Sequence, residues 1–125
     1  GLVGACVWDE RGGGPVSAFW AAAEELTPDV RGAEPRAGTR QGHLAALCAE
    51  AGLRVETDTR LEVTVRFASF AQWWAPYTLG VGPAGAHVAS LAPGDRDALR
   101  DACASRLPAG PFDVTAGAWT VLARA

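Results

Sequence analysis

The sequence predicts an α/β fold in which three strands are separated by helices. A continuous apolar run from Leu2 to Trp8, rich in valine and too short for a globular helix, fits a strand buried on both faces. Residues 55–67 alternate between apolar or threonine side chains and a second set that is charged except for Thr64, which indicates an edge strand with one solvated face. Residues 112–122 carry Val, Thr and Trp on both faces, which is typical of a central strand.

Composition sets limits on function. The 125 residues are 49% hydrophobic and 20% charged, which suits a single globular domain. The net charge is -3 and the arginines are scattered, so we expect no nucleic-acid partner, because a phosphate-binding face needs clustered cations. Lysine is absent, which excludes both a P-loop lysine and a Schiff-base lysine.

The cysteines and the apolar segments predict a cytoplasmic protein. Cys6, Cys48 and Cys103 are widely spaced and lie in apolar segments, so we expect buried thiols and no disulfide. No apolar stretch is long enough to span a bilayer, and no basic region of a signal peptide precedes the first strand. The sequence therefore predicts a soluble protein without a membrane partner.

Two helices are predicted between the first two strands. Ser17 can cap the first helix and Pro28 ends it, and its apolar positions follow helical spacing: Phe19, Trp20, Ala23 and Leu26. A loop over 28–40 follows, dense in Pro, Gly and charge. The second helix covers 41–51 with Gly52 at its C-terminal cap, and its apolar positions are Leu44, Leu47, Cys48 and Ala51.

Residues 69–107 form a helical insertion between the second and third strands. Ser69 and Gln72 make a capping box for a short helix that Pro76 breaks, and this helix carries an aromatic stripe: Phe70, Trp73, Trp74 and Tyr77. A looser segment covers 80–91. The last helix starts at Gly94 or Asp95, and Pro108 stops it.

Four strings carry a family resemblance: residues 1–9, the helix-to-strand joint 44–53, the aromatic string 67–74 and the closing string 118–124. In order and spacing they resemble the C-terminal half of class I S-adenosylmethionine-dependent methyltransferases, nearest to the ubiquinone/menaquinone-biosynthesis group. The resemblance covers nearly all of the chain. It implies a methyltransferase that acts on a small-molecule acceptor.

The resemblance also implies a topology. Leu2–Trp8 would be strand five of a Rossmann-like fold, residues 54–67 strand six, and residues 112–123 strand seven, inserted antiparallel between them. Residues 1–125 would then be one partial domain, partnered by the N-terminal half of the same fold. The family's Gly-rich turn and acidic residue, which hold S-adenosylmethionine, would lie outside these residues, and Gly12-Gly13-Gly14 is interpreted as a loop. We therefore expect the chain alone to be inactive.

Methyl transfer from a sulfonium mainly requires an aligned acceptor in a dry pocket. Trp8 and Asp9 end a strand where α/β sheets bind ligands, with strand-end packing and a turn as the alternative. The aromatic stripe could wall the pocket of an apolar acceptor, although helical spacing favours a role in anchoring the insertion to the core. The pocket candidates are Trp8, Asp9, Phe19, Trp20, Trp73, Trp74 and Tyr77.

The two histidines, His43 and His87, have no partner at metal-ligand spacing, so no metal site is expected. His87 is a candidate base toward an acceptor hydroxyl, with an ordinary surface residue as the alternative. The sequence does not indicate whether an oxygen, a nitrogen or a carbon atom would accept the methyl group.

A function of another class is also compatible with the sequence. The apolar first strand would leave an open backbone edge, which can pair with a second copy of the chain. The chain would then be a non-catalytic folding and association module that forms a homo-oligomer.

Overall fold

The computed structural model describes residues 1–32 and 35–125, and these form two compact units. The sheet unit consists of Gly1–Pro15, Ala33–Thr64 and Thr115–Ala125. The aromatic unit consists of Val16–Gly32 and Val65–Val114. Two long strands, β2 (Arg54–Phe67) and β3 (Phe112–Arg124), contribute residues to both units.

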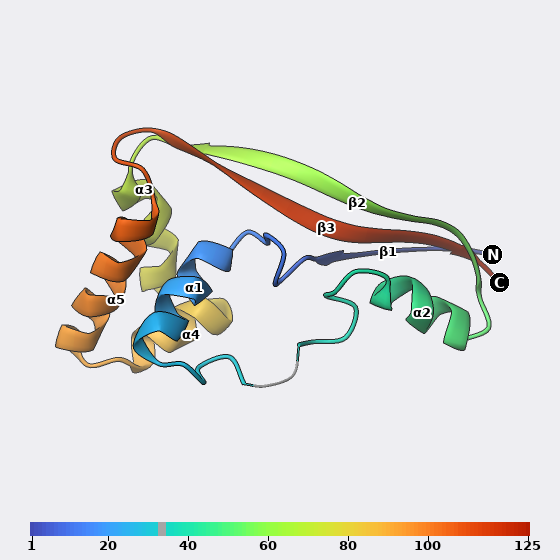
Figure 1. Cartoon of the computed structure of the whole chain (residues 1–125), viewed down its shortest axis with the longest axis horizontal. Coiled ribbons are helices and arrows are strands. Elements are labelled where there is room, and N and C mark those ends of the chain that lie inside the picture. Colours follow the sequence, from blue (N-terminus) through green and yellow to red (C-terminus); the bar gives the residue numbers. More distant parts are fainter. Residues whose placement is uncertain (33–34) are drawn as a thin grey trace. The chain divides into compact units, whose positions relative to one another are not determined.

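The strands form a three-stranded antiparallel sheet in the order β1-β3-β2 (Figure 1). Strand β1 (Leu2–Trp8) pairs with β3 from Leu2 opposite Arg124 to Trp8 opposite Ala118. The predicted central place of the last strand and edge place of residues 54–67 are confirmed. The mixed α/β class is confirmed as well.

Helix α2 (His43–Glu50) covers one face of the sheet. Leu44 and Cys48 of this helix pack against Val121 and Ala123 of β3. The helix begins two residues later than predicted because Gly42, at its N-cap, takes a left-handed φ of 76°. This packing gives the sheet unit its small core.

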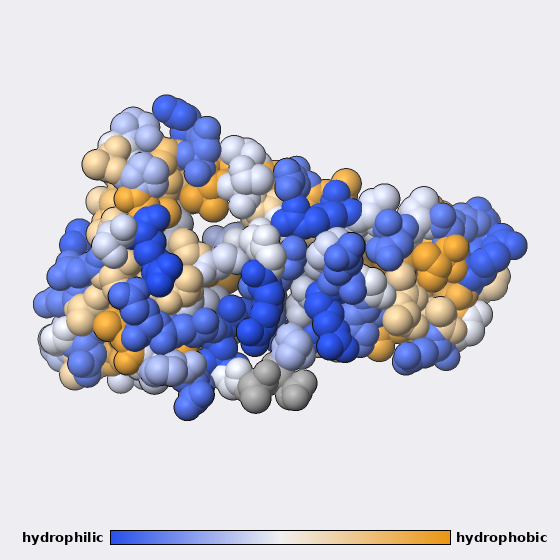
Figure 2. Space-filling model, in the orientation of Figure 1, coloured by the Kyte–Doolittle hydropathy of each residue, from blue (hydrophilic) through white to orange (hydrophobic). Residues whose placement is uncertain are grey.

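The predicted burial of β1 on both faces is wrong. Leu2 is 56% and Trp8 46% exposed, because α2 covers only the opposite face of the strand. On β2, Leu61 and Val63 are 55% and 49% exposed. The sheet unit thus carries apolar surface that none of its own helices covers, and Figure 2 shows apolar patches among polar side chains near the two chain ends.

Five short helical segments build the aromatic unit: α1 (Ser17–Leu26), α3 (Phe70–Trp74), the 3-10 helix η1 (Ala75–Leu79), α4 (Gly82–Ser90) and α5 (Pro93–Arg106). The N-cap of α1 is Val16, so the prediction that Ser17 caps this helix is wrong. The predicted cap of α3 is confirmed, since the Gln72 N–H donates to Ser69 Oγ at 3.2 Å. Pro76 does not end the helical path, which continues as η1.

Helix α4 corrects the prediction of a looser segment over 80–91. Pro83 lies in its first turn, where the missing N–H has no intrahelical acceptor to lose. Gly85 lets the helix approach the preceding turn, because a side chain there would begin 2.9 Å from the Gly80 carbonyl carbon. Glycine and proline usually disfavour helices, but Pro83 fits the first turn of α4 and Gly85 fits its close packing.

All three cysteines are free thiols. Cys48 and Cys103 are buried as predicted. Cys6 is exposed, so its predicted burial is wrong, for the same reason as that of the rest of β1. Within the described ranges, no helix combines the length and the apolar character needed to cross a bilayer.

Candidate functional site

The turn after β1 closes on Asp9, one of the predicted pocket residues. The Gly12 N–H donates to Asp9 Oδ1 at 2.8 Å, and Arg60 Nε donates to Asp9 Oδ2 at 3.2 Å. Asp9 is 5% exposed. Its carboxylate is therefore occupied by the chain itself, as the strand-end alternative predicts.

The glycines of this turn are packed against their own backbone. A side chain at Gly12 would collide with the Asp9 carboxylate, and one at Gly14 would begin 2.8 Å from the Asp9 carbonyl oxygen. The Gly117 N–H donates to the Gly13 carbonyl at 2.8 Å. This turn holds no open cradle for a ligand, so the residues present do not fit S-adenosylmethionine.

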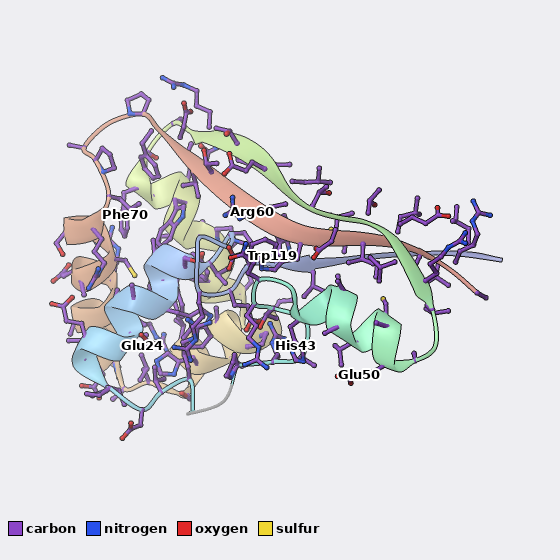
Figure 3. The ribbon with its side chains drawn as sticks, turned by 45° about the vertical axis from the view of Figure 1, so that its right-hand side comes forward. Glu24, His43, Glu50, Arg60, Phe70 and Trp119 are labelled. Atoms are coloured by element: carbon purple, nitrogen blue, oxygen red, sulfur yellow. The ribbon has the colours of Figure 1, made fainter. Side chains whose placement is uncertain are left out.

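Arg60 ties the turn to the sheet. Its guanidinium carbon lies 5.8 Å from the centre of the Trp119 ring (Figure 3). Its Nη1 donates to a Glu62 carboxylate oxygen at 2.6 Å. Hydrogen bonds from the guanidinium to Glu62 and Asp9 raise the pKa of Arg60. A side chain at Gly117 would collide with this guanidinium. The contacts of Asp9, Arg60 and Gly117 therefore stabilise the turn against the sheet. Trp8 is not part of them, because it lies on the open face of the sheet.

The other five pocket candidates lie together in the aromatic unit. Phe19 is fully buried, with its ring centre 5.1 Å from that of Trp20 and 4.6 Å from that of Tyr77. Trp73 and Trp74 are only 3% and 7% exposed. These rings, with Phe70, form a packed core, which agrees with the anchoring interpretation of the stripe for both tryptophans.

Burial also limits the chemistry of the aromatic core. Burial, with a smaller contribution from the nearby Cys103 thiol, raises the pKa of Tyr77 to about 12. Burial likewise raises the pKa of Cys103 to about 11. Neither group is ionised near neutral pH, so neither can serve there as a base or a nucleophile.

A groove of about 270 Å³ lies beside this core, between α1, α4 and α5. His87 lines the groove, and its ring centre lies 5.9 Å from that of Trp20 and 6.3 Å from that of Phe19. His87 is therefore the one predicted residue that joins the aromatic core to a ligand-sized space. The other residues of the lining are Ala23, Leu26, Thr27, Leu91, Asp95, Ala98 and Leu99.

Asp95 is the site residue that the sequence analysis missed. It lies in the first turn of α5 and lines the groove together with His87. Sequence reasoning used it only as a helix start. No local pattern in the sequence marks it, because Asp95 and His87 line the same groove only through the packing of α4 and α5.

His43 has a structural role. The Gly38 N–H donates to His43 Nδ1 at 3.1 Å, which holds the loop that leads into α2. In residues 1–32 and 35–125, no group of three or more His, Cys, Asp or Glu side chains gathers in a way that could hold a metal ion.

Comparison of the chain with protein-family models, curated proteins and solved structures finds no match.

Proposed function

We propose that the chain is the C-terminal, acceptor-side part of a class I S-adenosylmethionine-dependent methyltransferase that acts on a small molecule. The observation that carries the proposal is the strand order β1-β3-β2, with β3 antiparallel to β1. It is the same as the order of strands five, seven and six that the sequence resemblance implies. The helical insertion between β2 and β3 also has the expected place.

The open apolar face of the sheet supports the same proposal. Leu2, Trp8, Leu61 and Val63 are each about half exposed, although strands with this composition are normally covered. The remaining strands and helices of a larger domain would cover this surface. Further strands could also pair with the free backbone edge of β1.

The cofactor would be held mainly outside these residues, because the Gly12–Gly14 turn is filled by Asp9. When bound, S-adenosylmethionine supplies the reactive methyl group. This chain would supply the acceptor side: a rigid apolar core that excludes water, and the groove where His87 can accept a proton. The enzyme would be a cytoplasmic transferase with a small-molecule acceptor.

Methyl transfer is tested with the complete product of the gene that encodes this chain. The product is incubated with S-adenosylmethionine labelled in the methyl group and with a panel of small apolar acceptors. We expect cofactor binding in calorimetry and label in an acceptor, whereas the 125-residue chain alone binds no cofactor. A folded, homogeneous gene product that neither binds the cofactor nor transfers label would refute the proposal, as would micromolar binding by the chain alone.

The second candidate is the non-catalytic association module. The observation that favours it is the free edge of β1 together with the exposure of Leu2 and Val3, at 56% and 41%. Two copies could pair these strands antiparallel around a twofold axis. A stable dimer of the complete gene product without cofactor binding would favour this candidate over methyl transfer.

A further inference from the structure

The groove in the aromatic unit contains two polar groups without a partner. Within the described ranges, the His87 imidazole and the Asp95 carboxylate make no hydrogen bond and no ion pair. A neutral imidazole has one nitrogen that accepts a hydrogen bond, and an ionised carboxylate only accepts. Asp95 is exposed and His87 is half-buried, so water solvates both groups in the free chain, and a ligand that donates hydrogen bonds could replace that water.

The charge of the lining also limits which ligands the groove can bind. No arginine lines the groove, and the chain contains no lysine. Arg96, the neighbour of Asp95 in the sequence, donates from Nη2 to the Leu91 carbonyl at 3.3 Å and is not part of the lining. An anionic ligand would face Asp95 without a compensating cation, whereas a cation would neutralise it.

The other residues of the lining are alanines and leucines apart from Thr27, and they come from α1, the end of α4 and α5. Polar atoms contribute slightly more of the exposed surface of the groove than apolar atoms. A volume of about 270 Å³ lies just below the range of drug-sized pockets, so it suits a ligand of a single ring and a short chain. An apolar body would contact Leu26, Leu91 and Leu99.

We propose that this groove binds a small molecule with an apolar body and one protonated amine, and that Asp95 and His87 hold the ammonium group. The site is defined by the groove and its two unpaired acceptors, and it does not depend on the proposed methyl transfer. If both proposals hold, such an amine belongs to the class of molecules that the acceptor side would receive.

The test uses the 125-residue chain and 2-phenylethylamine, which is cationic at neutral pH, in calorimetry and in amide NMR. We expect saturable binding with shifts at Asp95 and His87. We expect 3-phenylpropionate, which has a similar shape but is an anion, to bind at least about tenfold more weakly, because it cannot pair with the carboxylate.

Two matched variants test whether the Asp95 carboxylate binds the ammonium group. Asp95→Asn keeps the shape of the side chain and should weaken amine binding about fivefold, which is the upper end of the effect of losing an exposed ion pair. Asp97→Asn removes an exposed carboxylate on the same helix that does not line the groove, and should leave the affinity within about twofold. Thermal melts establish that each variant is folded.

Three results would overturn the proposal. They are the absence of saturable binding at about 10 mM amine, equal binding of the carboxylate, and equal affinity of Asp95→Asn and the unchanged chain. No methyl donor is present in these measurements, so a failure to bind the amine does not bear on methyl transfer. Conversely, a failed transfer assay does not bear on amine binding.

Discussion

Replacing Phe19 by alanine tests whether the aromatic rings form a packed core or the wall of a pocket. Phe19 is fully buried, and four rings surround it: Trp20, Trp74, Tyr77 and His87. Truncation of a buried Phe to Ala costs about 3–5 kcal/mol, because apolar contacts are lost and a cavity remains. For a chain of this size, each kcal/mol lowers the melting temperature by roughly 4 °C, so we expect a loss of about 12–20 °C.

A gentler variant keeps the test valid if the alanine variant does not fold. Phe19→Leu keeps most of the volume but loses the ring pairs with Trp20 and Tyr77, at 5.1 and 4.6 Å, and should cost about 1–2 kcal/mol. The control is Leu79→Ala in the same unit, which is 73% exposed and should cost less than about 0.5 kcal/mol.

The assay is urea unfolding followed by tryptophan fluorescence, with circular dichroism as the second probe. The reasoning is refuted if Phe19→Ala and Leu79→Ala lower the free energy of unfolding equally. It is also refuted if Phe19→Leu costs nothing, because a pocket wall can lose a ring without leaving a cavity in the core.

Four other predictions concern the sheet unit and the thiols. Asp9→Ala should destabilise the chain by about 1–3 kcal/mol in urea unfolding, because the Gly12 N–H loses its acceptor. The control Asp58→Ala removes an exposed carboxylate and should change the free energy of unfolding little. Equal effects of the two substitutions would contradict a stabilising role for Asp9. Cys6 should react with a thiol reagent at pH 8 well before Cys103, which mass spectrometry can follow, and earlier labelling of Cys103 would contradict the burial. Burial raises the pKa of Cys103 from 9.0 to about 11. The stability that the buried neutral thiol contributes is therefore complete below pH 9.0 and is lost as the pH rises through about 11. Thermal melts over this pH range measure the loss. The chain alone should associate through residues 2–8 in light scattering; a strict monomer with these amides protected from hydrogen exchange would show that the edge is covered from within.

The sequence predicts the strands of this chain better than their burial. The alternation of residues 55–67 and the two-sided pattern of 112–122 depend only on local spacing, and both gave the correct place in the sheet. The pattern of Leu2–Trp8 shows which surface needs covering, but not whether the same chain covers it. Burial depends on which other segments are present, and local spacing does not contain that information.

The helical insertion over residues 69–107 was also predicted only in part. The cap at Ser69 was predicted because capping involves neighbouring residues only. Helix α4 was missed because its glycines and its proline have low helix propensity, and contacts with the preceding turn outweigh that preference. The groove was missed with it, since His87 and Asp95 come together only through the packing of α4 and α5 on α1.

The close approach of Arg60 to Gly117 has a consequence for how the strands find each other. Strand β2 repeats Val and Thr at every second residue, so sliding it by two positions along β3 would keep each side chain on its own face. Gly117 is the one glycine in β3, and only the native alignment gives the guanidinium both that space and the Trp119 ring. A pairing displaced by two positions would place a β3 side chain in the space that Gly117 leaves, so the guanidinium would have to move. The native alignment of β2 and β3, which are separated by more than forty residues, is therefore the one that accommodates Arg60 as it lies in this structure.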